Sequence, residues 1–443
     1  MNFSESHLIL KSCTQDFPII TRGEGVYLYD SSGRRYFDAT AGLFVASVGH
    51  GNRELASEIF ERSSRLAFVN SAYFTSEIAE ELGERLAGLE PSLGLARSLF
   101  LCSGSEAVEA AIKLARQICV ERGEERRHKI ISRVPSYHGN TLFALSVSGR
   151  PGAQKMFTPL LADVRKIASP YAYRPAFGPY EQSAERYAGL LEDAIVEAGP
   201  ESVAAFVVEP VSASAAAGDP PPPGYFDHVQ RICEKYGVLI IADEVLCGSG
   251  RSGKFFASSH FGLKPDLLTM GKGISGGYVP LSVVLAREEH LDTVKRGSGS
   301  LVHFQTYQQA PAVAGAGVSI LNYYERHGVV ENCARMGARL KARLIDTVGA
   351  HPNVGYVAGT GLLLGIDIVE DKAAKRPFPR ARKTAERLAE TGLSLGLSFH
   401  PYYGHAAGGD GDFIMLSPPL TITEREVEEL VGLVHETLRA YFH

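Results

Sequence analysis

The sequence predicts an α/β fold, with a large domain built on a mainly parallel sheet flanked by helices. A smaller α+β domain is expected to combine both termini. Between about residues 76 and 330, helical patterns alternate with short apolar runs bounded by polar residues. Such runs are typical of strands buried on both faces, which occur in parallel sheets covered by helices.

The large domain is expected to span residues 66–330, with 1–65 and 331–443 as the two parts of the small domain. Its clearest apolar runs are 129–132, 203–208 and 238–242. One helix is predicted from apolar residues at helical spacing, namely Ala107, Ala110, Ala111, Leu114, Ala115 and Ile118. With 443 residues, 45% of them hydrophobic, the chain can bury more than one core.

The small domain is predicted from shorter patterns near the ends of the chain. Two strands should surround the turn 30–33, and the final helix should open with the capping box Thr423-x-x-Glu426. Between them we expect a helix at 329–350, a strand at 362–368, a helix at about 380–391 and a strand at 413–416.

Composition excludes several classes of function. The net charge of −5 offers no basic excess, so we expect neither a nucleic-acid nor a membrane partner. The N-terminal residues lack the basic start and apolar stretch of a signal peptide. Six dispersed cysteines without a CxxC pair disfavour a disulfide framework or a metal site, and they favour a cytoplasmic protein.

A glycine-rich loop offers a rival interpretation. Gly248-x-Gly250-x-x-Gly253 matches a dinucleotide-binding pattern, which would make the protein a nicotinamide-dependent oxidoreductase. That pattern should open a helix, yet Lys254-Phe-Phe-Ala-Ser-Ser follows it. The same loop nearly forms a Walker A motif, but Phe255 stands where a Ser or Thr should hold magnesium. The nucleotide interpretation is therefore disfavoured.

Two motifs follow strand-like runs early in the large domain. In Ser103-Gly104-Ser105-Glu106 a capping box begins a long helix, whose free amides and two hydroxyls suit a phosphate. An ordinary capped helix would look the same. In Tyr137-His138-Gly139 an aromatic side chain could lie flat on a planar cofactor, although the motif alone favours a core tyrosine.

Two charged residues lie near the ends of later apolar runs. Asp243 ends Val238-Leu-Ile-Ile-Ala and needs a partner in such surroundings; a pyridinium nitrogen is one, and a helix or loop that it caps is another. Lys272 lies between Gly271 and Gly273, where desolvation would lower the pKa of its amine and make it a nucleophile toward aldehydes. In isolation, a surface lysine in a flexible turn would be the better account of Lys272.

Taken in order, these motifs resemble one family. Ser-Gly-Ser-Glu-Ala, Tyr-His-Gly, Val-Glu-Pro, Asp-Glu-Val and Gly-Lys-Gly look like the class III (omega) aminotransferases, pyridoxal 5′-phosphate (PLP) enzymes of fold type I. The likeness extends from residue 38 to residue 423, so nearly the whole chain is similar to the family. Each motif is weak alone, and the ordered set is specific.

The resemblance implies a role for each matching residue. Lys272 would form the Schiff base and Asp243 would hold the pyridine nitrogen, with Tyr137 and Val245 on opposite faces of the ring and Thr306 reaching the phosphate in the neighbouring subunit of a homodimer. The other positions implied to contact cofactor or substrate are Ser103, Gly104, Ser105, His138, Glu209 and Phe44.

The sequence departs from the family where an arginine often binds the substrate carboxylate. Met415 and His400 stand at the two places where that arginine is expected. Histidine gives neither the fixed charge nor the bidentate fork of arginine. The insert 402–411 is either a plain surface loop or a replacement, with His405 or backbone amides as candidates. We therefore expect pyruvate to be preferred over 2-oxoglutarate.

The expected reaction moves an amino group from a primary amine or ω-amino acid to a 2-oxo acid. Lys272 would act as general base and then as general acid. Aminomutases, racemases and decarboxylases of the same family share every motif named above, so these alternatives remain open. A non-catalytic ligand-binding protein on the same fold would not depend on Lys272.

Overall fold

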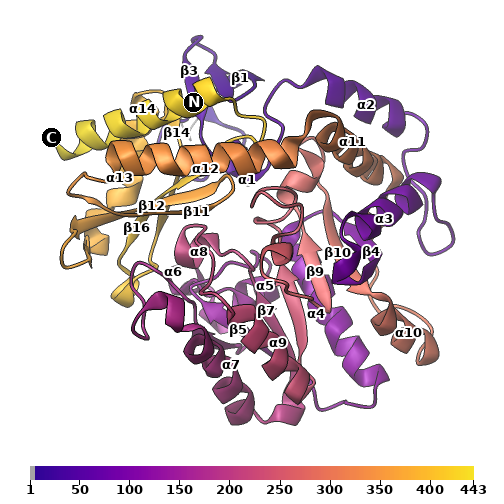
Figure 1. The fold of residues 1–443 in the computed structure, drawn as a ribbon. Coiled ribbons are helices and arrows are strands. Elements are labelled where there is room, and N and C mark those ends of the chain that lie inside the picture. The colour runs from indigo at the N-terminus through magenta and orange to yellow at the C-terminus, as the bar shows by residue number, and fades with distance from the viewer. Residues whose placement is uncertain (1–4) are drawn as a thin grey trace.

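A computed structural model describes residues 5–443, and three sheets with flanking helices form its framework (Figure 1). The largest sheet contains β4 (Leu95–Leu101), β5 (Lys129–Val134), β6 (Arg165–Ala168), β7 (Val203–Val208), β8 (Leu239–Asp243), β9 (Leu267–Met270) and β10 (Ser282–Arg287). Their order is β4-β10-β9-β8-β7-β5-β6, and only β10 runs antiparallel to its neighbours. The predicted α/β class with a mainly parallel sheet is confirmed.

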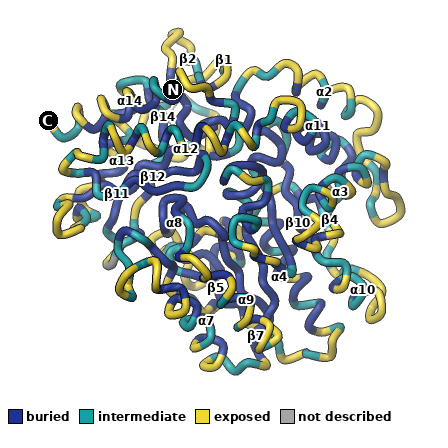
Figure 2. The backbone as a smooth tube through the Cα atoms, viewed as in Figure 1, coloured by how far each residue is buried: buried dark blue, intermediate teal, exposed yellow. Residues whose placement is uncertain are grey.

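Helices cover both faces of this sheet, as the apolar runs predict. One face packs against α3 (Glu77–Leu89), α7 (Ala184–Ala198), α9 (Tyr225–Tyr236) and α11 (Pro311–His327), and the other against α4 (Gly104–Glu121), α5 (Leu142–Val147) and α10 (Glu288–Arg296). Every residue of β7 is buried; Phe206 belongs to the first core and Val207 to the second. Figure 2 shows these central strands buried beneath more exposed helices.

The N-terminal and C-terminal segments share a small sheet. It contains β1 (Ile20–Glu24), β2 (Tyr27–Asp30), β3 (Arg35–Asp38) and β14 (Leu397–Ser398), and β3 pairs with β14 in parallel. In Figure 1 the first strands accordingly lie beside the C-terminal helix α14 (Glu424–Phe442). The exact domain boundaries at residues 65 and 330 stay predictions.

A third sheet belongs to the C-terminal segment. It contains β11 (Val354–Thr360), β12 (Leu363–Asp371), β13 (Arg376–Pro377), β15 (His400–Tyr403) and β16 (Asp412–Leu416), with α12 (Val329–Val348), α13 (Thr384–Ser394) and α14 packed nearby. Shorter helices are α1 (Ala41–Phe44), α2 (Arg53–Ser63), α6 (Pro151–Gln154) and α8 (Ala213–Ala216). Both predicted capping boxes are present, at Ser103 before α4 and at Thr423 before α14.

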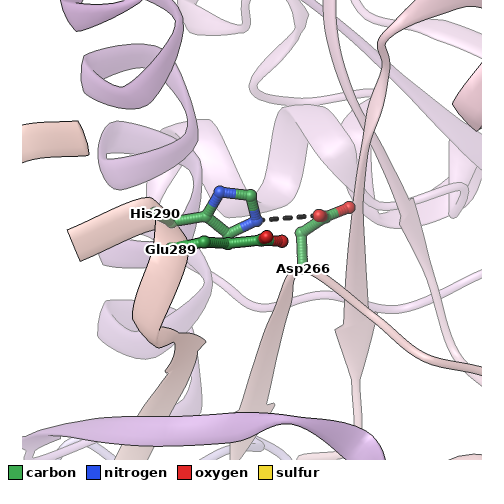
Figure 3. A group of neighbouring side chains, drawn as sticks. All are labelled: Asp266, Glu289 and His290. Carbon is green, nitrogen blue, oxygen red and sulfur yellow. Dashed lines mark hydrogen bonds and ion pairs between the residues drawn. The ribbon is translucent and has the colours of Figure 1, made fainter. Parts of the chain in front are cut away.

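A cluster of acidic residues and a histidine, where β9 begins, has a structural role (Figure 3). Asp266 accepts hydrogen bonds from the Ile240 amide at 2.7 Å and pairs with His290 Nε2 at 2.8 Å. Arg122 donates to His290 Nδ1 at 2.9 Å, so both ring nitrogens are engaged. The network ties α10 and the end of α4 to the sheet. Separately, no helix within residues 5–443 is long and apolar enough to cross a bilayer.

Candidate active site

Parallel strands bring four of the predicted site residues to one edge of the large sheet. Tyr137 follows β5, Glu209 follows β7, Asp243 ends β8 and Lys272 follows β9. The carboxyl ends of parallel strands meet at the same edge, where open α/β sheets bind ligands. Residues far apart in sequence therefore converge because of the sheet topology.

These side chains surround a cavity of about 180 Å³. Most of its wall consists of residues expected from the sequence, with some apolar additions. The lining residues are Gly104, Ser105, Tyr137, His138, Gly139, Glu209, Val211, Ala213, Asp243, Val245, Leu246, Cys247 and Lys272. The Lys272 amine and the Asp243 carboxylate thus share one pocket, rather than pointing into separate regions.

Lys272 is held in a strained and crowded backbone position. Its φ of 47° lies in the left-handed region, which non-glycine residues adopt rarely and which recurs at functional sites. A Cβ on Gly271 would lie 3.1 Å from Val245 Cγ1, and one on Gly273 would lie 3.3 Å from Ser249 Cβ. The two glycines therefore allow the turn to pass close to its neighbours. Burial lowers the pKa of the Lys272 amine, and Asp243 partly opposes this effect.

Asp243 is buried, and hydrogen bonds fix its carboxylate. Its Oδ2 lies 2.7 Å from His138 Nδ1, and its Oδ1 accepts from Thr269 Oγ1 and from the Val245 amide, both at 3.1 Å. Thr269 was not predicted from the sequence, although a lone hydroxyl within the apolar strand 267–270 was a usable signal. The three contacts hold the acid rigidly at the wall of the pocket.

The beginning of α4 supplies a site for an anion at the same pocket. The first amides of a helix have no partner within the helix, and its dipole favours negative charge there. Gly104 and Ser105 are the first two residues of this 18-residue helix, and both line the cavity. Gly104 also passes close to Val245, because a Cβ would come within 2.6 Å of Val245 Cγ1. Ser105 Oγ accepts the Asn140 amide at 2.9 Å.

Other predicted residues lie beside the pocket or away from it. Ser103 is not part of the wall, because its hydroxyl accepts the Glu106 amide as the helix cap. Phe44 lies close, with its ring centroid 5.7 Å from the Lys272 Nζ and 5.7 Å from the His400 ring. Thr306 lies on the segment 301–308, outside the wall.

His405 does not line the pocket, although the sequence predicted that it binds the substrate. Its ring stacks on Phe413 with centroids 3.6 Å apart, and its Nε2 pairs with Asp367 at 3.2 Å. Arg174 and Tyr171 bond the same carboxylate. The side chain of His405 is therefore committed to a buried structural cluster, which explains why an imidazole is tolerated there.

Glu209 and Glu244 are both buried acids, but only Glu209 lines the cavity. Glu209 Oε2 accepts a hydrogen bond from Ser212 at 2.8 Å, and burial raises the pKa of its carboxyl group. Glu244 accepts the amides of Ala257 and Ser258 at 2.6 and 2.7 Å. It thereby fixes the loop that follows β8.

The glycine loop 248–253 does not have the geometry of a nucleotide-binding loop. Turns and bends follow β8 through residue 256, and the next element is a short 3-10 helix at Ala257–His260. The loop also packs against the C-terminal segment, since Gly250 approaches Val330 and Leu420. The alternative of a nicotinamide-dependent oxidoreductase is thus contradicted.

Comparison with known proteins identifies the family. The model of the aminotransferase class III family matches residues 11–438. This chain belongs to the class III aminotransferases. It is 34% identical over 435 residues to the uncharacterized aminotransferase YodT of Bacillus subtilis (strain 168), and the match covers 98% of each chain.

Solved omega-transaminases have the same fold as this class III aminotransferase. The thermostable (S)-enantioselective enzyme from Thermomicrobium roseum superimposes with a TM-score of 0.90 at 34% identity, covering 99% of this chain and 97% of the other. The Pseudomonas jessenii enzyme, solved in complex with PMP, gives a TM-score of 0.88 at 32% identity, covering 96% and 92%. The sequence-based recognition of the family is confirmed.

Class III aminotransferases use PLP, and the pocket of this one fits that cofactor. The amides that begin α4 suit a phosphate, and the fixed carboxylate of Asp243 suits a protonated ring nitrogen. Burial lowers the pKa of the Lys272 amine, which suits a nucleophile that reacts with the aldehyde group of the cofactor. A side chain on Gly104 would obstruct this space, because Val245 lies directly against it.

Proposed function

We propose that this aminotransferase moves an amino group from a primary amine or ω-amino acid to a 2-oxo acid, with pyruvate preferred. One observation carries the proposal: Lys272 and Asp243 line the same pocket, whose wall also contains the ring of Tyr137 and several apolar side chains. An uncharged donor side chain can bind against such a wall without leaving a buried charge unpaired.

Each residue of the pocket would have its own role in binding the cofactor or in catalysis. Gly104 and Ser105 would hold the phosphate, Asp243 the ring nitrogen, and Tyr137 and Val245 the two faces of the ring, with His138 orienting the carboxylate of Asp243. The bound cofactor supplies an electron sink for the bond that breaks at the substrate carbon. Lys272, whose side chain lines the same pocket, would take a proton from that carbon and later return one.

The preference for pyruvate is supported by the missing arginines. Met415 is buried in β16, and burial is the main effect that lowers the pKa of His400 to about 4, so His400 is neutral at physiological pH. Neither residue can hold the second carboxylate of 2-oxoglutarate by charge. A small acceptor with a single carboxylate has less need of such a group.

The test is a half-reaction with a panel of donors. Holoenzyme is mixed with a primary amine or an ω-amino acid, without any acceptor, and the cofactor spectrum is followed. Conversion to the aminated cofactor, reversed by pyruvate more efficiently than by 2-oxoglutarate, is expected. Inversion of a chiral amine without accumulation of that form would indicate a racemase, and release of carbon dioxide would indicate a decarboxylase. Return of a rearranged amino acid would indicate an aminomutase.

The protein is proposed to work as a homodimer with shared sites. Exposed apolar side chains gather on the segments 66–74 and 302–307. The two segments touch through Phe68 and Tyr307, whose ring centroids lie 6.0 Å apart. Tyr73 is 80% exposed and Val302 is 71% exposed, which is costly unless a partner covers them. Thr306 lies on the same surface and would reach the phosphate of the partner's site.

Complementation tests the shared site. Lys272→Ala homodimers should be inactive and Thr306→Ala homodimers should bind PLP weakly, whereas mixed dimers contain one site with both native residues. Activity that returns on mixing the two variants supports the dimer, and its absence in dimers shown to have exchanged subunits contradicts it.

Six cysteines without disulfides support a reducing compartment such as the cytoplasm.

A further inference from the structure

Arg150 lies beside the pocket, against two aromatic rings. Its guanidinium carbon lies 4.5 Å from the centroid of the Tyr402 ring and 5.6 Å from that of Tyr137. Tyr137 lines the pocket. Arg150 precedes α6 and comes from the large sheet's side of the pocket, whereas Tyr402 belongs to β15 of the C-terminal segment.

A series of aromatic neighbours connects Arg150 to Lys272. From Tyr402 the next contact is with His400, at 6.5 Å between ring centroids, and His400 in turn contacts Phe44 at 5.7 Å. Phe44 lies 5.7 Å from the Lys272 Nζ. Burial, then the charge of Arg150, then that of Lys272 lower the pKa of His400, so both cations act on the same imidazole.

Arg150 differs from the other arginines of this region because its charge is not committed. Arg133 donates to the Glu209 carbonyl, Arg174 pairs with Asp367, and Arg251 donates to the Leu362 and Pro418 carbonyls. Among residues 5–443, no carboxylate forms an ion pair with Arg150. Stacking on a ring uses the face of a guanidinium and leaves the N–H groups at its edge available for a carboxylate.

We propose that Arg150 binds the carboxylate next to the keto group of the 2-oxo acid, a contact that neither His400 nor Met415 can make by charge. The inference rests on the proposed aminotransferase function and specifies how that site selects acids. Two tyrosine rings restrict the guanidinium, so less conformational entropy is lost when the acid binds. Arg150 is a substrate-binding residue in this account, and the bonds that break and form remain with Lys272.

The experiment compares two acceptors that differ only in the carboxylate. Holoenzyme is first converted to its aminated form with a donor amine and then mixed with pyruvate or with acetaldehyde. The measured quantity is the ratio of the two kcat/KM values in wild type, Arg150→Gln and Arg150→Lys. Because a charged hydrogen-bonded contact is lost, the ratio should fall about 10- to 100-fold in Arg150→Gln and less in Arg150→Lys.

Lys155→Gln is the matched control, because Lys155 is an exposed cation at the other end of α6. It removes the same charge and should leave the ratio unchanged. A binding measurement avoids turnover: calorimetric titration of the holoenzyme with propionate should show at least a tenfold higher Kd in Arg150→Gln than in wild type.

Each outcome distinguishes the two proposals. If wild type aminates neither acceptor, the proposed aminotransferase function is overturned, and the propionate titration still tests Arg150. If both acceptors react but Arg150→Gln lowers their kcat/KM values equally, Arg150 is structural and this inference is wrong. If Arg150→Gln binds propionate with the same Kd as wild type, this inference is also wrong.

Discussion

His400 and Met415 are directly opposite each other across the antiparallel strands β15 and β16. The two sequence positions at which an arginine was expected are therefore one place in the structure, and neither residue is charged there at physiological pH. On the same strand, Tyr402 is two residues beyond His400 and so projects from the same face. That face meets Arg150, which comes from the opposite side of the pocket.

Introducing an arginine at this place should broaden the choice of acceptor. His400→Arg adds a second guanidinium near Phe44, where it can bind the distal carboxylate of 2-oxoglutarate. We expect the kcat/KM for 2-oxoglutarate, relative to that for pyruvate, to rise about tenfold. His400→Gln is the control, because it removes the imidazole without adding charge. Equal acceptor ratios in the two variants would contradict the prediction.

Loss of the Lys272 amine should abolish the reaction while leaving the fold intact. Lys272→Ala holoprotein should lack the absorption of a lysine Schiff base and should fail in single-turnover transamination. Borohydride reduction of wild-type holoenzyme, followed by peptide mapping, should place the cofactor on Lys272. Lys155→Gln should keep both properties, whereas an adduct on any lysine other than Lys272 would refute the assignment.

Thr269 should matter more with cofactor than without it. Thr269→Val keeps the shape of the side chain but removes the hydroxyl that donates to Asp243 at 3.1 Å. A hydrogen bond to a charged group contributes about 1.5–3 kcal/mol, so PLP affinity should fall about 10- to 100-fold. The measurement is the increase in Tm on adding PLP.

Thr437→Val is the matched control for Thr269→Val. Thr437 is also fully buried, but its hydroxyl donates to the Leu433 carbonyl within α14, outside the wall of the pocket. It should shift the Tm of apo and holo protein alike. A Thr269→Val variant that behaves in this way would show that Asp243 does not depend on the threonine.

Local sequence patterns predicted the elements well and the substrate site less well. The run 203–208 coincides with β7, and the capping residues Ser103 and Thr423 stand where the helices begin, because burial and capping depend on nearby residues. Arg150 could not be found in this way, since its environment is created by Tyr402, far along the chain. His405 was misjudged for the same reason, because the sequence does not show that Asp367 lies beside it.

The buried carboxyl group of Glu244 should make stability depend on pH. Burial raises its pKa from 4.5 to about 7 in the folded protein, so between these values the folded state binds more protons than the unfolded state. The contribution of Glu244 to the free energy of unfolding is fully present below pH 4.5 and is lost as the pH rises through about 7. A shift of this size corresponds to about 3 kcal/mol. Glu244→Gln cannot titrate and should escape this loss.

Urea denaturation of wild type and Glu244→Gln at several pH values between 4.5 and 8 measures the effect. The unfolding free energy of wild type minus that of the variant should fall by about 3 kcal/mol across this range. Glu436→Gln, at an exposed position of α14, should give a difference that does not change with pH. A pH-independent difference for Glu244→Gln would mean that the amides of Ala257 and Ser258 keep this carboxylate ionised in the folded protein.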